Sequence, residues 1–319
     1  MQVISLPYKP IPQGLYTRDD LFGAYKSNKP SSWGHTTDFD IYQHYISEGG
    51  STPNQYMGMM QALHDNAITQ FTKAFIRHRK VAAIMGDHGM RRDSEPYRDI
   101  AILSHRLTRS GILMCSGGGP GAMEASHLGA SLAKKSVSHL ESELKRLKIQ
   151  PEVPKNLKDI VNAKGEVNSA LVAKAHAWFK PAYEIAKRTS SPSDSLAVPT
   201  WDYGHEPTTP FATHIAKYFQ NSLREDGLLA IAKQGIVYAE GKAGTIQEIF
   251  QDSTQNFYNT FKHFSPMIMF GVEYWTTKYP VVGVLQKLFK PADFKKFVLV
   301  TDDVEDAAKF IMHFVPKQG

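Results

Sequence analysis

Residues 115–125 read Cys-Ser-Gly-Gly-Gly-Pro-Gly-Ala-Met-Glu-Ala, and this stretch decides the fold that the sequence predicts. The apolar run at 112–115 predicts a buried strand, and the spacing of Met123, Leu128 and Leu132 predicts a helix. Between them, glycines without a Cβ permit positive φ angles and let a ligand approach the backbone closely. Free N–H groups at the helix start, together with the helix dipole, favour an anion. The stretch therefore predicts a phosphate-binding strand–loop–helix unit, or else a glycine-rich turn without a ligand.

A second stretch of the same kind follows later in the chain. Residues 235–239 are apolar and predict a buried strand, residues 240–245 read Glu-Gly-Lys-Ala-Gly-Thr and predict a loop, and a helix is expected from 246 with Thr245 as its N-cap. In an open parallel sheet, loops that follow the carboxyl ends of strands line the ligand crevice. We therefore expect the two glycine loops to form two walls of one crevice.

Strand patterns alternate with helix patterns along most of the chain, which is typical of an α/β fold with a Rossmann-like, doubly wound, mostly parallel sheet. Residues 1–79 are interpreted as an N-terminal arm and helix, in which the arm wraps either the domain or a partner subunit. Residues 80–319 are interpreted as a Rossmann-like nucleotide-binding domain with a helical insertion at about 134–194. Strands are predicted at 81–86, 112–115, 195–199, 235–239, 266–271 and 297–300, and helices at 55–79, about 94–110, 123 through the 130s, 215–231, 246 onward, 279–289 and 304–314.

The composition agrees with a water-soluble domain. Of 319 residues, 42% are hydrophobic and 21% are charged, which is enough for a sizeable core. The net charge of +6 suits a protein that binds small anions but is too weak to indicate nucleic-acid binding. The single cysteine, Cys115, excludes a disulfide within the chain. No apolar run is long enough to span a membrane, and residues 1–12 show no signal-peptide pattern, so we expect a cytoplasmic protein.

Both glycine loops resemble the motifs of the Lonely Guy family, Rossmann-like nucleotide 5′-monophosphate phosphoribohydrolases that were long mislabelled as lysine decarboxylases. The family motif G-G-G-P-G-x-M-E-A is matched throughout by residues 117–125. The second motif, P-G-G-x-G-T-x-x-E, is matched by residues 240–248 in part. Glu240 stands in place of the proline, and Lys242 stands in place of the second glycine.

The likeness is closest to the long bacterial members, which hydrolyse purine and pyrimidine nucleoside monophosphates. Their M-G-G-H-x-x-x-R loop resembles residues 85–92, and their E-P-x-x-P stretch resembles residues 206–210, which lead to Arg224. The resemblance covers roughly residues 80–130 and 195–315. It implies hydrolysis of the N-glycosidic bond to give free base and ribose 5-phosphate, no cofactor, and a homodimer or larger homo-oligomer with its site at the subunit seam.

The resemblance also implies roles for individual residues. Glu248 would stabilise the cationic transition state and orient water, although a glutamate in a first turn can also simply complement the helix dipole. Arg224 would act beside Glu248, or else be a solvated or salt-bridged arginine. Glu124 would bind ribose hydroxyls or cap a helix, and Lys242 would strengthen phosphate binding or pair with Glu240. The full set of predicted substrate- and phosphate-binding residues is Arg92, Gly118, Gly119, Gly121, Glu124, Gly241, Lys242, Gly244 and Thr245.

No two of the thirteen histidines lie three or four residues apart, so the sequence predicts no metal site. His88 lies in the first crevice loop and either touches the base or is a turn residue. A dinucleotide dehydrogenase is disfavoured because the spaced G-x-G-x-x-G motif is absent. The main alternative to an enzyme is a non-catalytic protein that binds or senses a nucleotide or cofactor, as molybdenum-cofactor carrier proteins do; Glu240 and Lys242 favour it.

Overall fold

A seven-stranded sheet forms the centre of the protein, and each of its strand pairings is parallel. The computed structural model describes residues 6–260 and 264–316. The strand order is β4-β3-β2-β1-β5-β6-β7, which confirms the predicted α/β, Rossmann-like, doubly wound sheet. The strands are β1 (Lys80–Met85), β2 (Ile112–Ser116), β3 (Ser195–Ala197), β4 (His214–Ile215), β5 (Gly235–Tyr238), β6 (Met267–Phe270) and β7 (Val298–Thr301).

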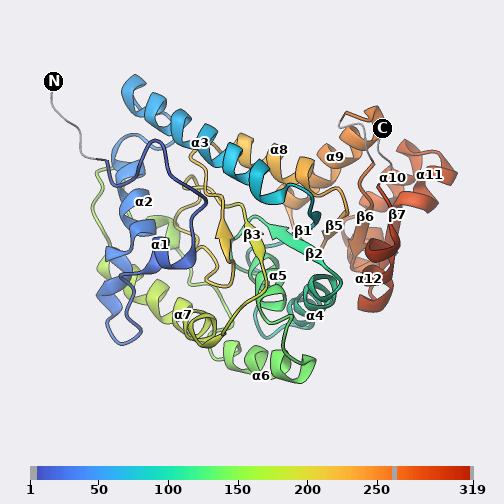
Figure 1. The fold of residues 1–319 in the computed structure, drawn as a ribbon, viewed down its shortest axis with the longest axis horizontal. Coiled ribbons are helices and arrows are strands. Elements are labelled where there is room, and N and C mark those ends of the chain that lie inside the picture. The colour runs from blue at the N-terminus through green and yellow to red at the C-terminus, as the bar shows by residue number, and fades with distance from the viewer. Residues whose placement is uncertain (1–5, 261–263, 317–319) are drawn as a thin grey trace.

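Helices cover both faces of the sheet, which explains why its strands are almost continuously apolar. In β1, Ala82 and Ile84 point to one face, and Val81, Ala83 and Met85 point to the other. The first face packs on α4 (Glu95–Arg109), α5 (Ala122–Ser131) and α12 (Val304–His313). The second packs on α3 (Gln55–Ile76), α8 (Asn221–Ile231), α9 (Ala243–Tyr258) and α10 (Val281–Leu288). Figure 1 shows the two layers, with α3 and α8 on the opposite side of the sheet from α4.

The order of the strands reverses at β1. The chain adds β2, β3 and β4 on one side of β1, then returns to place β5 on its other side. The loops that leave the carboxyl ends of β1, β2 and β5 therefore diverge around one crevice, where doubly wound sheets bind their ligands. This topology brings the two glycine loops to the same edge of the sheet.

Several element boundaries differ from those that the sequence predicts. Ile215 lies in β4 instead of a helix, because its backbone pairs with Ala197 and also bridges to Tyr16. Helix α9 begins at Ala243 with Lys242 at its N-cap, so Thr245 is inside the first turn and does not cap it. Before α10, a π-helical turn spans Tyr274–Lys278. The last helix before β7 is α11 (Pro291–Phe297), which was not predicted.

The N-terminal arm packs on its own domain. It contains α1 (Arg18–Phe22), the 3-10 helix η1 (Pro30–His35) and α2 (Thr37–Ser47). Their aromatic side chains are buried against α7 (Ser169–Arg188) and the segment around Trp201. Of the two alternatives, wrapping the domain is the one observed for the described part of the arm; residues 1–5 lie outside the described residues.

The predicted insertion at 134–194 contributes α6 (Val137–Leu147), the 3-10 turn η2 (Leu157–Asp159) and α7. Leu140, Leu144 and Leu147 of α6 join the core cluster of α4 and α5, so the insertion extends the sheet's helical cover. Over the described ranges 6–260 and 264–316, none of the helices has both the length and the apolarity needed to cross a bilayer.

Candidate functional site

A cavity of about 360 Å³ lies at the carboxyl edge of the sheet, where β1, β2 and β5 end. Its walls come from the two glycine loops, from the first βα loop after β1, and from helices α8 and α9. Most of its polar lining is ionisable. The cavity-lining residues are Ile84, Met85, Gly86, Asp87, His88, Gly117, Met123, Tyr203, Glu206, Arg224, Glu225, Lys242, Ala243, Gly244, Thr245 and Glu248.

The backbone of Asp87 joins the two glycine loops. Its N–H donates to the carbonyl oxygen of Glu240 at 2.9 Å, and its carbonyl oxygen accepts from the N–H of Ala122 at 3.3 Å. Gly86 allows this close packing, since a Cβ there would lie only 2.8 Å from the Cβ of Ala122. The predicted arrangement, in which two glycine turns meet at one crevice, is therefore what the structure shows.

The N-terminus of α9 opens into the cavity. Lys242 occupies the N-cap position, and no side chain caps the helix. Lys242, Ala243, Gly244 and Thr245 all line the cavity, and the first N–H groups of a helix have no partner within it. Gly241 packs so closely on Thr245 that a Cβ at this glycine would overlap the threonine side chain. An uncapped helix start of this kind is a good site for an anionic group.

Glu248 projects from the same helix face into the cavity. Residues three and four apart on a helix share a face, so Glu248 follows Thr245 along the cavity wall. Its carboxyl group is only 16% exposed and lies 4.0 Å from Nη1 of Arg224. Burial raises the pKa of Glu248 to about 7, and the Arg224 charge partly opposes this shift. Glu248 is therefore poised to gain or lose a proton near neutral pH.

Arg224 lies between α9 and the first glycine loop. A Cβ at Gly117 would be 3.3 Å from its Nη2, and its Nη1 lies 3.9 Å from Glu225 Oε1. The guanidinium group is 12% exposed. Its buried Nε has no hydrogen-bond partner among the residues that the structure describes. A buried donor without a partner is costly, so this nitrogen is available to a ligand in the cavity.

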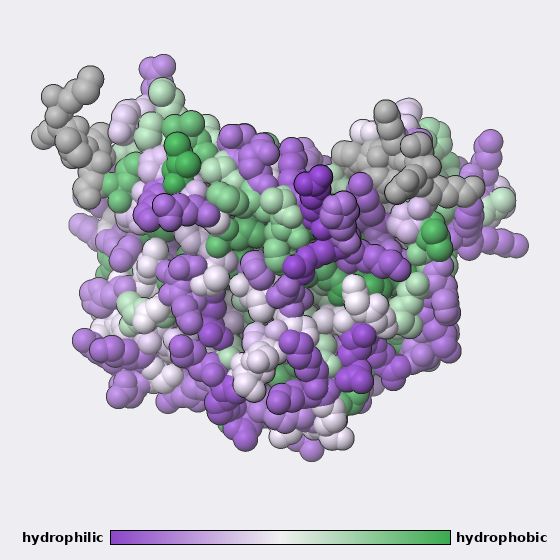
Figure 2. All heavy atoms as spheres, viewed as in Figure 1, coloured by the Kyte–Doolittle hydropathy of each residue, from purple (hydrophilic) through white to green (hydrophobic). Residues whose placement is uncertain are grey.

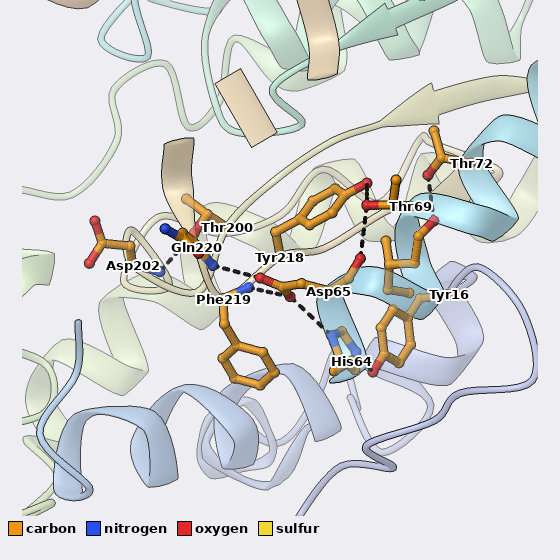
Figure 3. A network of polar contacts seen from close by, with 11 residues as sticks. Tyr16, His64, Asp65, Thr69, Thr72, Thr200, Asp202, Tyr218, Phe219 and Gln220 are labelled. Carbon is orange, nitrogen blue, oxygen red and sulfur yellow. Dashed lines mark hydrogen bonds and ion pairs between the residues drawn. The ribbon is translucent and has the colours of Figure 1, made fainter. Parts of the chain in front are cut away.

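Asp65 of the neighbouring helix α3 contacts the segment that leads into α8, the helix that carries Arg224 (Figure 3). Gln220 is the N-cap residue of α8, and its side chain makes no capping hydrogen bond. The buried Asp65 carboxylate instead binds the backbone just before the helix: Oδ1 accepts from the N–H of Phe219 and Oδ2 from the N–H of Gln220, each at 2.9 Å. His64 Nδ1 contacts the same carboxylate at 3.3 Å. This carboxylate anchors the segment that leads into α8 and places an acidic group at the start of the helix.

A second buried carboxyl group, Asp252, follows Glu248 one turn later on α9. It accepts hydrogen bonds from the hydroxyl groups of Tyr238 at 2.8 Å and Ser265 at 3.2 Å. Burial raises the pKa of Asp252 to about 7, although both hydrogen bonds oppose the shift. Asp252 does not line the cavity, and it ties α9 to the end of β5.

The structure places Arg92 and Glu124, both predicted to contact substrate, in a buried ion pair outside the cavity lining. The two side chains are each 1% exposed and form a bidentate ion pair, with Nη2–Oε1 at 2.6 Å and Nε–Oε2 at 2.7 Å. Arg92 also donates to the carbonyl oxygen of Trp178 at 2.8 Å, and the Tyr97 hydroxyl donates to Glu124 at 2.8 Å. These hydrogen bonds occupy the donors of Arg92 and connect α7 to the β1–α4 loop. Arg92 does not line the cavity.

Four of the predicted phosphate-contacting glycines also stay outside the cavity lining: Gly118, Gly119, Gly121 and Gly241. The N–H of Gly118 donates to Ser116 Oγ at 3.1 Å, and its carbonyl oxygen accepts from Thr209. Gly121 has a φ of +66°, and a Cβ there would lie 2.8 Å from the carbonyl oxygen of His88. These glycines shape the loops. The motif residues that reach the cavity are Gly117, Met123, Lys242, Ala243, Gly244, Thr245 and Glu248.

Lys242 pairs with Asp87 and not, as one of the two alternatives predicted, with Glu240. Its ammonium nitrogen lies 3.6 Å from Asp87 Oδ2, and its side chain is 73% exposed. The cavity also contains Asp87, Tyr203, Glu206 and Glu225, which were not assigned roles from the sequence. Glu206 belongs to the E-P-x-x-P stretch, and Asp87 follows the first strand of the sheet, so sequence patterns could have identified both as site residues. For Glu225, the only such indication is its place beside Arg224.

No model of a known protein family matches this sequence, and no curated protein is significantly similar to it. Within the described parts of the chain, no group of three or more His, Cys, Asp and Glu side chains is placed to hold a metal ion. The interpretation of the cavity therefore depends on its own geometry and on the two glycine motifs.

Proposed function

We propose that this protein hydrolyses the N-glycosidic bond of nucleoside 5′-monophosphates, giving free base and ribose 5-phosphate. The observation that carries the proposal is the placement of Glu248 and Arg224 in one cavity with the uncapped start of α9. The resemblance of both glycine loops to Lonely Guy motifs points to the same reaction.

The start of α9 is the proposed phosphate site. Its first N–H groups and the helix dipole favour an anion. Lys242 adds a positive charge at the same end of the cavity. The Nε of Arg224 offers a further donor. A phosphate held here would leave the ribose within reach of Glu248, which lies one turn further along the helix.

Glu248 and water carry out the proposed chemistry. The bond between C1′ and the base nitrogen breaks, and both electrons leave with the base, so positive charge develops on the sugar. The Glu248 carboxylate stabilises that charge and accepts a proton from the attacking water, whose oxygen bonds to C1′. The proton passes through solvent to the departing base. Arg224 keeps part of the Glu248 population ionised by lowering its pKa.

Released base and ribose 5-phosphate are the products to measure, after incubation with AMP, GMP, CMP and UMP. Glu248→Gln should lower kcat by about 10²- to 10⁴-fold while calorimetry still detects nucleotide binding. Glu184→Gln, which changes an exposed glutamate of α7, is the matched control and should retain full activity. Normal turnover by Glu248→Gln would refute the assignment.

A binding or sensing protein without turnover is the second candidate. The contact between Lys242 and Asp87 favours it, because this ion pair occupies the cavity where the family motif has a glycine. Tight binding of a nucleotide monophosphate with no release of base, by the unmodified protein, would establish this alternative.

We also propose a homodimer or larger homo-oligomer that assembles through α3. Figure 2 shows an apolar area over this helix. Tyr56, Met59 and Leu63 of α3 are exposed, as is Leu223 of α8, and large exposed apolar patches mark interaction surfaces. Because α8 carries Arg224, such an interface would adjoin the cavity. Light scattering should give a mass of at least two chains, and Met59→Glu should reduce it to one.

A further inference from the structure

A second cavity, of about 480 Å³, adjoins the candidate site. His88 and Glu206 line both cavities, and His88 Nδ1 lies 3.8 Å from Glu206 Oε1. The far wall of the second cavity is the segment at 152–158, which precedes and begins η2. A ligand that extends past His88 and Glu206 would enter this space.

The two cavities differ in the charged groups that line them. The first is lined by four carboxyl groups, with Arg224 and Lys242 as its permanent cations. The second is lined by Arg91, Lys155 and Lys158, with Glu152 and Glu206 as its acids. Arg91 is already paired, with Asp93 at 2.8 Å and with Glu152. Lys155 and Lys158 form no ion pair or side-chain hydrogen bond with any residue that the structure describes, which leaves their charges uncompensated.

Glycosidic cleavage separates charge in the same direction. The sugar becomes cationic while the departing base becomes anionic. Carboxylates on the sugar side and ammonium groups on the base side would both be complementary to that transition state. His205 adds a hydrogen-bonding group to the second cavity, and burial lowers its pKa, which favours the neutral imidazole at neutral pH.

We propose that the second cavity is the subsite for the leaving base, and that Lys155 and Lys158 make it selective for bases that carry or develop negative charge. This inference rests on the proposed function, and it names the substrate class: nucleoside monophosphates with acidic, oxo-substituted bases. Both lysines are exposed residues of the segment before and within η2. They can be changed without disturbing the core.

The test compares xanthosine 5′-monophosphate, which has an acidic base, with adenosine 5′-monophosphate, which does not. In the Lys155→Gln/Lys158→Gln variant, the ratio of kcat/KM for the two substrates should fall about tenfold, the equivalent of about 1.4 kcal/mol. The matched control is Lys164→Gln/Lys174→Gln, which removes the same charge from exposed positions outside both cavities. Its ratio should stay that of the unmodified protein.

The outcomes separate this proposal from the proposed function. Turnover with an unchanged substrate ratio in the Lys155/Lys158 variant would overturn the subsite and leave the reaction intact. If neither nucleotide is hydrolysed, the proposed hydrolysis is refuted, and the subsite is then tested by measuring the affinities of both nucleotides by calorimetry. Tighter binding of the xanthosine nucleotide, lost only in the Lys155/Lys158 variant, would support it. Equal affinities, or no binding of either nucleotide, would overturn it.

Discussion

Glu248 experiences two opposing electrostatic effects. Removal from water disfavours its charged form, and the Arg224 guanidinium, 4.0 Å away, favours it. The balance raises the pKa to about 7, so both protonation states are populated at neutral pH. A group in this condition can accept a proton from water and release it again within one catalytic cycle.

The first prediction concerns the pH dependence of turnover. If ionised Glu248 is the active form, kcat/KM should rise as the pH increases through about 7. Arg224→Gln removes the charge that opposes the shift, so the midpoint should move to higher pH as the rate falls. Initial rates from pH 5.5 to 9 for both proteins would measure this. A midpoint that is unchanged by the Arg224 substitution would contradict the coupling.

The second prediction concerns Asp252 and stability. Burial raises its folded-state pKa from the usual 3.8 of an aspartate to about 7, so in this range the folded protein holds a proton that the unfolded chain releases. The free energy of unfolding should therefore fall as the pH rises from about 4 to about 7, then level off. Asp252→Asn should reduce this slope by roughly 2–3 kcal/mol between pH 5 and 8, and the part due to Glu248, whose pKa is also raised to about 7, should remain. Urea unfolding at both pH values measures it, with exposed Asp293→Asn as the control that keeps the slope.

At the scale of elements, the position of Arg224 depends on α3 as well as on α8. Asp65 accepts hydrogen bonds from the backbone N–H groups of Phe219 and Gln220, directly before the helix. Loss of this carboxylate would leave both buried donors without their partner and would free the segment that leads into α8. Arg224 lies in the first turns of α8 and would move with it.

The third prediction follows from this contact. Asp65→Ala should lower kcat/KM clearly, and Asp65→Asn less, because the amide keeps one acceptor oxygen. The loss should be much smaller when Arg224 is already replaced by Gln, since residues that act through one another are not additive. A double-mutant cycle on kcat/KM measures the coupling. Full additivity would show that Asp65 matters to the fold alone.

Local patterns were enough to predict most of the elements and the meeting of the two glycine loops. Buried strands of a parallel sheet are apolar throughout, and glycine loops mark their carboxyl ends. Patterns did not reveal contacts between segments that are distant in the sequence. The motif position of Arg92 predicts a phosphate contact, and it gives no sign of the buried ion pair with Glu124 that the structure shows. No sequence pattern predicts the role of Asp65, because its hydrogen-bond partners are the backbone groups of Phe219 and Gln220, far along the chain.

At the scale of the whole molecule, the N-terminal arm is part of the main fold. Trp33 is 5% exposed and packs on Phe22 and Phe179, with ring centroids at 5.9 and 4.8 Å. Asp38 of α2 forms a buried ion pair with Lys217 at 2.7 Å, and Lys217 also donates to Thr208. The arm thereby holds the segment that carries Glu206.

The fourth prediction tests this integration. Trp33→Ala should destabilise the whole protein by about 3–5 kcal/mol, because it leaves a large cavity in an aromatic cluster. Tyr258→Ala, which removes an aromatic side chain that is 73% exposed, should cost less than about 0.5 kcal/mol. Urea unfolding followed by fluorescence and circular dichroism measures both. An early, separate transition of the arm in the unmodified protein would contradict the prediction.

The central position of β1 has a consequence for how the chain is made. One neighbour, β2, is the next strand to be synthesised, while the other, β5, follows only after β3, α7 and β4. Until β5 emerges from the ribosome, β1 is an apolar edge strand, which is the kind of edge that pairs with other chains. Nascent or truncated chains that end before Gly235 should therefore aggregate or require chaperones, and the cavity can form only after Glu248 has been translated.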